Sequence, residues 1–256
     1  MIASVVAPGE CQVWWAGPRD HPEETLLSVL SEPELERAAR FRREPDRRRF
    51  LTGSWLLRTA SAVQFGIRPE EVVVDRSCPD CTRYHGKPRV RARGFPLHVS
   101  VSHSEDRVAV AVTAEGPVGV DVEAVPADPV DDLARCALTE AELTVLEAFP
   151  QEDRYEAFAK VWVRKEAALK ATGHGLRVPP TEVAVSGPAE DPALLSWPLD
   201  IPPESLRFRV LSPGSGYVAA VAVITDRPVE AVEFHLPAAR ADFARGPVPG
   251  PLAGVA

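Results

Sequence analysis

Apolar and polar positions along the chain follow two periods, which predict helices and strands in successive blocks. Around residues 46–66 and 153–173 the apolar positions recur with the spacing of an amphipathic helix, and each segment ends at a glycine. Residues 107–113 and 118–123 instead alternate valine with a second residue. This period of two is typical of β-strands. The chain is therefore expected to combine helices with sheets.

The two helical segments belong to an internal repeat. Trp162 follows Trp55, and Gly173 follows Gly66, by the same offset of 107 residues. Each copy also begins with a Ser/Thr-x-x-Glu pattern, which is typical of a helix N-terminus. Chance similarity between two Ala- and Arg-rich helices is the alternative explanation. We prefer a tandem duplication, which predicts an α+β fold of two similar α/β halves related by a pseudo-twofold axis.

The repeat also suggests a domain division. We expect residues 1–116 to form the N-terminal half and residues 117–236 to form the C-terminal half. Residues 237–256 are rich in Pro, Gly and Ala and are expected to form a flexible tail. A chain with an internal pseudo-dimer of this kind is expected to be a monomer.

Composition and charge exclude several classes of protein. The net charge of −8 argues against a nucleic-acid-binding protein. No apolar run approaches the 18 or so residues of a membrane span, and the first residues lack the basic segment and apolar core of a secretion signal. Four cysteines are too few for a disulfide scaffold. A reduced, cytoplasmic protein is expected.

One stripe of the second helix collects chemically active side chains. Trp162, Glu166 and Lys170 are four residues apart, so they lie on one helical face. Only four of the 29 basic residues are lysines, so a lysine at this position indicates that a compact charge is needed rather than a planar guanidinium. The first copy has Thr59 and Val63 where the second has Glu166 and Lys170.

A pair of carboxylates marks the strand predicted at residues 118–123. Asp121 and Glu123 share one face of this strand, roughly 7 Å apart at their Cα atoms, while valines occupy the other face. Such a pair suits a hard divalent cation, with Glu166 as a possible third ligand; a solvated strand edge is the alternative. The second copy has Val232 and Phe234 in place of these acids. Charged residues from both halves therefore predict a single site at the interface of the halves.

Several further residues suit phosphate binding. Ser102, His103 and Ser104 end an alternating segment, and their hydroxyl, imidazole and backbone N–H groups can bind phosphate oxygens, although a structural histidine is the alternative. Lys87 precedes Pro88, which restricts the backbone and predicts a rigid turn. Arginines cluster at the start of the first long helix, where most are expected to be solvated and one or two to bind a phosphate: Arg37, Arg40, Arg42, Arg43, Arg47, Arg48 and Arg49.

Cysteine spacing leaves a further possibility open. Cys78 and Cys81 form a Cys-x-x-Cys pair with His85 close by, which resembles half of a zinc site. A structural zinc site has four ligands, and neither Cys11 nor Cys136 stands at a convincing spacing. A pair of loop thiols without metal is the alternative interpretation.

Taken together, four motifs occur in the order and spacing of one family. They are Gly86-Lys-Pro88, Ser102-His-Ser104, Gly119-Val-Asp-Val-Glu123 and Trp162-x-x-Lys-Glu-x-x-x-Lys170. From about residue 25 to about residue 235 the chain resembles the Sfp-type 4′-phosphopantetheinyl transferases. The last two motifs carry the most specificity as a pair, and the length resembles the double-unit class rather than the half-length, trimeric class.

The resemblance implies both a reaction and a site. Such an enzyme moves the 4′-phosphopantetheine arm of coenzyme A to a serine of an apo acyl- or peptidyl-carrier protein, as in polyketide and non-ribosomal peptide biosynthesis, and releases adenosine 3′,5′-bisphosphate. The implied roles are Mg²⁺ binding by Asp121, Glu123 and Glu166, catalysis by Glu166 and Lys170, and coenzyme A binding by Arg37, Arg42, Arg49, Lys87, Pro88, Ser102, His103, Asp121 and Lys170.

Some alternatives stay open at the level of sequence. The base that accepts the serine proton is either Glu166 or a metal-bound water. A catalytically inactive module that binds coenzyme A or a carrier protein is the first rival function, and a zinc-stabilised interaction protein built around Cys78 and Cys81 is the second. Neither the preferred carrier nor the arginines that contact the 3′-phosphate follow from the motifs.

Overall fold

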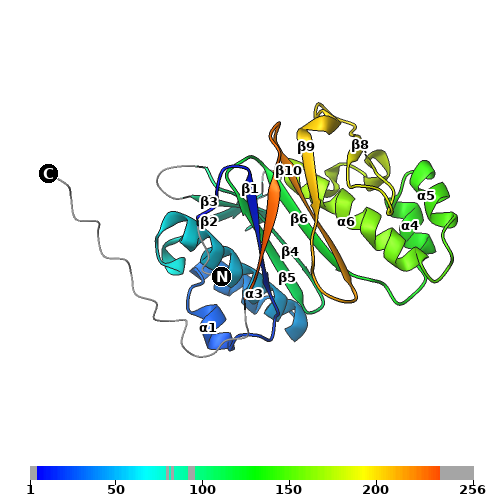
Figure 1. Cartoon of the computed structure of the whole chain (residues 1–256). Coiled ribbons are helices and arrows are strands. Elements are labelled where there is room, and N and C mark those ends of the chain that lie inside the picture. Colours follow the sequence, from blue (N-terminus) through cyan, green and yellow to red (C-terminus); the bar gives the residue numbers. More distant parts are fainter. Residues whose placement is uncertain (1–4, 79–80, 82–83, 92–95, 237–256) are drawn as a thin grey trace.

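Two sheets pack face to face at the centre of the protein, and one long helix covers the outer face of each (Figure 1). The computed structural model describes residues 5–78, 81, 84–91 and 96–236. The first sheet has the order β11-β1-β5-β4 and the second the order β6-β10-β9. Their bounds are Glu10–Ala16 (β1), His98–Ser104 (β4), Arg107–Thr113 (β5), Val118–Ala124 (β6), Leu206–Val210 (β9), Tyr217–Ile224 (β10) and Glu230–His235 (β11).

The helices and the smaller strands complete each half. The first half contains α1 (Glu23–Leu27), α2 (Glu32–Ala39), α3 (Glu44–Phe65) and a hairpin of β2 (Val73–Ser77) and β3 (Tyr84–Arg91). The second contains α4 (Asp131–Ala137), α5 (Glu140–Glu147), α6 (Arg154–Thr172) and a small pair of β7 (Ala184–Val185) and β8 (Leu194–Ser196). The prediction of an α+β fold is confirmed.

Successive side chains of a strand point to opposite faces of its sheet, so each strand can pack against a helix on one face and against the other sheet on the other face. In β5, Val108, Val110 and Val112 pack on α3, whereas Ala109 and Ala111 face the second sheet. Small residues on the inner face let the two sheets approach each other closely. Because both faces of β5 are covered, nearly all its residues are apolar and buried, as expected for a strand at the centre of a layered fold.

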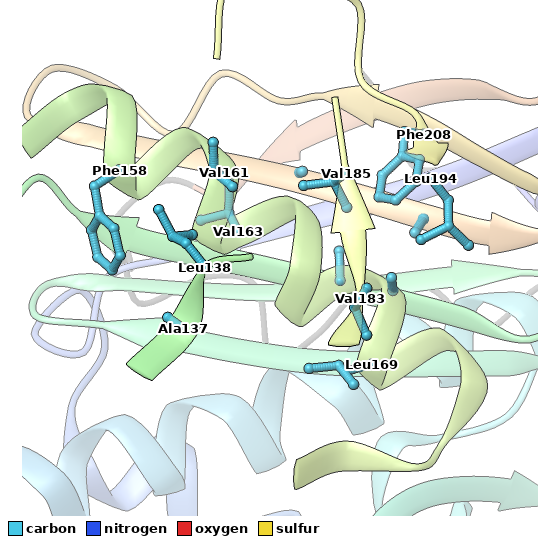
Figure 2. Packing of buried hydrophobic residues seen from close by; sticks show 14 of the residues in the cluster. Ala137, Leu138, Phe158, Val161, Val163, Leu169, Val183, Val185, Leu194 and Phe208 are labelled. Carbon is cyan, nitrogen blue, oxygen red and sulfur yellow. The ribbon is translucent and has the colours of Figure 1, made fainter. Parts of the chain in front are cut away.

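The second half has its own core on the outer face of its sheet. Figure 2 shows this cluster, to which Phe158, Val161 and Leu169 of α6 belong together with Leu194 of β8 and Phe208 of β9. Burial of these side chains contributes roughly 1.5–3 kcal/mol each, which anchors α6 firmly along the sheet. The position of α6 matters because the predicted stripe lies on the same helix.

The two copies of the sequence repeat have matching helix starts and helix ends in the structure. Ser31 and Thr139 each form a capping box at the start of a helix, α2 and α5 respectively. Helices α3 and α6 end at Gly66 and Gly173, both with a left-handed backbone (φ 63° and 75°) that favours glycine. The predicted helix ends are therefore confirmed.

The last strand of each repeat crosses to the other sheet. Strand β6 follows β5 in sequence but pairs with β10, and β11 follows β10 but pairs with β1 in parallel. The predicted boundary at residue 116 falls in the β5–β6 connection, so it assigns β6, the last strand of the first copy, to the second half, whose sheet it joins; β11 belongs to the second half in sequence and to the first sheet in space. This exchange joins the two halves through their backbones. The predicted tail lies outside the described residues.

Among the described helices, none is both long and apolar enough to cross a membrane.

The segment Gly86–Pro88 lies within β3, so the expectation of a rigid turn there is wrong. Pro88 is tolerated in this strand because it lies beside a register shift between Asp75 and Ser77 of β2, where the regular ladder is interrupted.

Candidate active site

One face of β6 lies directly against α6. The valines of β6 face the first sheet, and Gly119, Asp121 and Glu123 face the helix. A Cβ atom at Gly119 would lie 2.0 Å from the carbonyl oxygen of Ala167, so only glycine lets α6 pack this closely. The two carboxylates share one face of β6, as the alternation predicts, and the close contact brings that face to the stripe on α6.

The predicted stripe of α6 lines a cavity of about 340 Å³. We call this cavity the site pocket. Trp162, Glu166 and Lys170 all line it from α6, while most of their neighbours on the helix are buried. The other lining residues come from α2, α3, β2, β4 and β6: Arg37, Arg49, Phe50, Gly53, Ser54, Arg76, Val101, Ser102, His103, Asp121 and Glu123. Both halves therefore contribute, as predicted.

Lys170 and Asp121 are in direct contact across the pocket. Lys170 Nζ lies 2.5 Å from Asp121 Oδ1 and 2.9 Å from Ser102 Oγ, and it also donates to the carbonyl oxygen of Val120 at 3.3 Å. Ser102 Oγ in turn donates to Asp121 Oδ1 at 2.8 Å. This small network holds the ammonium and one carboxylate oxygen in place.

A ladder of serine hydroxyls joins the two sheets beside the pocket. Ser100, Ser102 and Ser104 alternate along β4, and their Oγ atoms accept hydrogen bonds from the backbone N–H groups of three alternate residues of β6. Ser104 Oγ also donates to Glu123 Oε2 at 2.9 Å. The serines thus replace backbone pairing at this edge of β6 and hold both carboxylates of the strand.

Electrostatics within the pocket favour a cation. Burial raises the pKa of Glu123 to about 7; the charge of Asp121 adds to the rise, and hydrogen bonds from Ser104 and Trp162 oppose it. Burial also raises the pKa of Glu166, with Lys170 opposing the shift and Asp121 adding to it. Three carboxyl groups facing one ammonium leave an excess of negative charge when all are ionised.

The donor set fits a magnesium ion. Asp121 Oδ2 is buried and has no hydrogen-bond partner among the described residues. An unsatisfied carboxylate oxygen in a buried position costs free energy unless another group binds it. Together with the carboxyl groups of Glu123 and Glu166, it offers oxygen ligands of the kind that Mg²⁺ prefers.

Four basic side chains also line the pocket, and we call them its basic rim. They are Arg37, Arg49, Arg76 and His103. Arg49 donates to Asp46 and to the carbonyl oxygen of Glu105, and Arg37 lies over the ring of Phe50. Burial lowers the pKa of Arg76 to about 10, so its guanidinium stays charged at neutral pH. Guanidinium groups and carboxylates in one pocket suit a polyphosphate bridged by a metal.

Three of the predicted binding residues lie elsewhere. Arg42 is exposed and does not line the site pocket. Pro88 is buried within β3. Lys87 Nζ donates to the carbonyl oxygens of Lys170 and Ala171 at 2.7 and 3.0 Å, which stabilises the C-terminal end of α6. Burial lowers the pKa of Lys87 to about 8.

Sequence reasoning missed Arg76 as a contributor to the pocket. Arg76 lies within β2, whose alternation is weak, and no motif includes it, so only the tertiary structure places it in the pocket lining. The contact of Ser104 with Glu123 was also missed. The period of two in β4 puts Ser104 on the same face as Ser102, and this was the available signal.

A second hollow, of about 840 Å³, adjoins the site pocket at Arg49. Its other lining residues are Gly17, Pro18, Arg19, Asp20, Glu44, Pro45, Arg48, Glu105, Asp106, Arg107 and Tyr217. Asp121, Glu123, Glu166 and Lys170 do not line this second hollow, so the chemistry is assigned to the smaller site pocket.

The fold and the pocket together define a class of enzyme. Two α/β halves share one pocket in which acids and a lysine face arginines, and this arrangement is typical of metal-assisted phosphoryl-group transfer. A sequence model of the 4′-phosphopantetheinyl transferase superfamily matches residues 117–222, which include β6 and α6.

Full-length relatives agree with this match. The 4′-phosphopantetheinyl transferase HetI of Nostoc sp. is 32% identical over 216 residues, which cover 82% of this chain and 86% of that protein. A 4′-phosphopantetheinyl transferase of Bacillus subtilis is 28% identical over 158 residues, and the transferase Sfp of the same species is 27% identical over 158 residues; each match covers 61% of this chain and 66% of the relative. The chain belongs to the 4′-phosphopantetheinyl transferase superfamily, whose members transfer phosphopantetheine from coenzyme A to carrier proteins.

Proposed function

We propose that the site pocket is where this chain transfers the 4′-phosphopantetheine group of coenzyme A to a serine of an apo acyl- or peptidyl-carrier protein, with Mg²⁺ as cofactor. Adenosine 3′,5′-bisphosphate is the second product. The observation that carries the assignment is the convergence of Asp121 and Glu123 on β6 with Glu166 and Lys170 on α6 around one cavity. The rival function of an inactive binding module finds no support, because Asp121, Glu123, Glu166 and Lys170 of the two specific motifs all line the same pocket.

Mg²⁺ would be held by Asp121, Glu123 and Glu166. Asp121 Oδ2 is the buried oxygen that lacks a partner among the residues described, and Glu123 is oriented by Ser104. When bound, the ion neutralises charge on the pyrophosphate of coenzyme A. The protein supplies the remaining functions through its own side chains.

Lys170 would stabilise the transferring phosphate. Its ammonium has three protons, and in this structure they go to Asp121, Ser102 and the carbonyl of Val120. The bond to Val120 is the longest, at 3.3 Å, so it is the easiest to exchange for a phosphate oxygen. Lys170 then donates to the phosphate while it stays fixed by Asp121 and Ser102.

Glu166 would act as the general base. It accepts the proton of the carrier serine while the serine oxygen forms its bond to the β-phosphorus of coenzyme A. The bond from that phosphorus to the bridging oxygen breaks, and its electron pair leaves with adenosine 3′,5′-bisphosphate. Burial raises the pKa of Glu166, which makes its carboxylate a stronger base than an exposed glutamate.

The basic rim would bind the adenine-nucleotide end of coenzyme A. Arg37, Arg49 and His103 are at the pocket, and Arg76 takes the place that the sequence interpretation gave to Arg42. A guanidinium group can bind a phosphate through two parallel hydrogen bonds. Because Arg49 borders both hollows, it is the best-placed group to contact the 3′-phosphate.

Carrier proteins of polyketide and non-ribosomal peptide synthesis are the substrates we propose, and the cytoplasm is the proposed location.

We further propose that the chain acts as a monomer. In support, β6 and β11 exchange between the two sheets and the sheets bury an apolar layer against each other. The internal pair of halves thus supplies the interface that would otherwise require a second chain.

The test is transfer to a purified carrier, followed by intact mass spectrometry. Incubation with coenzyme A, Mg²⁺ and an apo-carrier should add one phosphopantetheine group, and a chelator of Mg²⁺ should abolish the gain. Asp121→Asn and Glu166→Gln should each lower turnover at least 100-fold. Glu156→Gln is the matched control, because Glu156 lies on the same helix but pairs with Lys160 at the surface. Near-normal turnover by either pocket variant would refute the assigned site.

A further inference from the structure

Three metal-binding side chains come together at the end of the β2–β3 hairpin, away from the carboxylates of the site pocket. Cys78 follows β2 directly, His85 is the second residue of β3, and Cys81 lies between the two strands. One ligand atom from each residue lies within 4.8 Å of the other two, and Cys81 Sγ is 3.0 Å from His85 Nε2. Cys81 and His85 are exposed and Cys78 is half-buried, so an ion can reach them.

We propose that Cys78, Cys81 and His85 bind a soft divalent metal ion, of which zinc is the chief candidate. In a tetrahedral zinc site, with Zn–S near 2.3 Å and Zn–N near 2.0 Å, neighbouring ligand atoms are about 3.5 Å apart. The observed cluster therefore needs only small side-chain adjustments to hold an ion. Two thiolates and one imidazole select zinc over Mg²⁺, which prefers oxygen ligands.

The charge of the ion also matches its ligands, because two cysteines that lose their protons on binding supply the two negative charges that a divalent ion neutralises. Three protein ligands leave a fourth position for water or another exogenous ligand. The site is distinct from the one proposed for Mg²⁺, because none of its ligands lines the site pocket.

The ion would strengthen the hairpin where its pairing is irregular. The β2–β3 register shifts between Asp75 and Ser77, so the regular ladder is interrupted just before the hairpin end. A Cβ atom at Gly86 would lie 2.4 Å from the carbonyl oxygen of Ser77, so the two strands approach very closely at this point. A metal bound to Cys78 and His85 would tie the two strands together beside this close approach.

The hairpin end also borders the basic rim of the site pocket. Arg76 lies in β2 two residues before Cys78, and Arg37 Nη1 donates to the carbonyl oxygen of Tyr84 at 3.3 Å. The proposed ion would thereby hold the backbone that positions Arg37 and Arg76. Its role is structural, so metal binding can be tested without the transfer reaction.

Cobalt titration of metal-free, reduced protein tests the proposal directly. One equivalent of Co²⁺ should bind with the charge-transfer absorption of cobalt–thiolate bonds, and added Zn²⁺ should displace it. Cys81→Ser and His85→Ala should each weaken binding at least tenfold. Cys136→Ser is the matched control, because Cys136 is an exposed cysteine on α4 in the other half. Absence of a thiolate band, or an unchanged titration in Cys81→Ser, would overturn the proposal.

Thermal unfolding provides a second readout. Because a ligand that binds only the folded state raises its stability, Zn²⁺ should raise the unfolding temperature of the wild type and of Cys136→Ser but not of Cys81→Ser. Intact mass under non-reducing conditions distinguishes the other outcome. A disulfide between Cys78 and Cys81 in freshly purified protein, with no Co²⁺ binding after reduction, would show that the pair is a redox couple and that the metal site is wrong.

Discussion

Lys165 and Glu142 form a buried ion pair, with Nζ 2.5 Å from Oε2. The same relationship occurs in the first half between Arg58 and Glu34, at 2.7 Å. In each half the acid belongs to a capping box and the base to the long helix. The base also donates to two carbonyl oxygens, which are those of Pro69 and Val72 in the first half and those of Pro180 and Val183 in the second.

This correspondence separates the two lysines of the motif on α6. Lys165 points into the core of its half and repeats the structural role of Arg58, whereas Lys170 points into the site pocket, where the first half has Val63. Spacing within the motif places the two lysines on different faces of the helix. One lysine therefore supports the fold, and the other belongs to the site.

Glu142→Gln should destabilise the fold strongly. The substitution leaves the buried Lys165 ammonium without its counter-charge, which typically costs about 3–5 kcal/mol. Urea unfolding followed by fluorescence would measure this loss. Glu156→Gln breaks an exposed pair with Lys160 and should cost no more than about 1 kcal/mol. Equal losses in both variants would contradict the importance of the buried network.

Ser104→Ala should weaken the response to Mg²⁺. The hydroxyl of Ser104 donates to Glu123 and accepts from the backbone of Ala124, so its removal frees one proposed metal ligand. Loss of such a supporting hydrogen bond typically lowers metal affinity or activity by about 10–100-fold. The concentration of Mg²⁺ that gives half-maximal transfer measures the change.

Ser100→Ala is the control for that variant. Ser100 belongs to the same serine ladder and accepts from the N–H of Val120, but it contacts no carboxylate of the site. It should cost similar stability and leave the Mg²⁺ dependence unchanged. If both variants shift the Mg²⁺ dependence equally, the ladder acts through the packing of the sheets and not through Glu123.

Thr59→Ala should leave turnover within about twofold of the wild type. Thr59 occupies the position in α3 that Glu166 occupies in α6, but the site pocket does not include it. Its hydroxyl is buried without a hydrogen-bond partner among the described residues, so its removal should also cost little stability. A large fall in turnover at unchanged stability would show that the first half contributes to catalysis at the repeated position.

Stability should fall in acid partly because of His21. Burial lowers the pKa of this side chain, which packs against the ring of Trp55 with the centroids 4.3 Å apart. The unfolded chain therefore binds the proton more tightly than the folded chain. The free energy of unfolding should decrease as the pH falls from about 6.5 towards the lowered pKa of the folded state.

His21→Phe tests that dependence. Phenylalanine keeps the ring contact with Trp55 but cannot titrate, so the variant should lose less stability than the wild type between pH 7.5 and pH 5.5. Urea unfolding at the two pH values gives the comparison. An identical acid sensitivity in both proteins would assign the effect to other groups.

Much of the site was predictable because its pattern is local. Four-residue spacing alone places Trp162, Glu166 and Lys170 on one helical face, and two-residue spacing alone places Asp121 and Glu123 on one strand face. Both faces are present as predicted. The glycines at the ends of the two long helices were predictable for the same reason, since a left-handed backbone is a property of one residue and its neighbours.

Contacts between distant segments were decided only by the tertiary structure. No local period shows that β6 and β11 exchange sheets, that Arg76 reaches the pocket while Arg42 stays in solvent, or that Lys87 binds the end of α6. These outcomes depend on which surfaces pack together, and packing sums many weak contacts across the whole chain. The sequence by itself therefore determined which side chains share a face, and the packing of the two halves decided which faces meet.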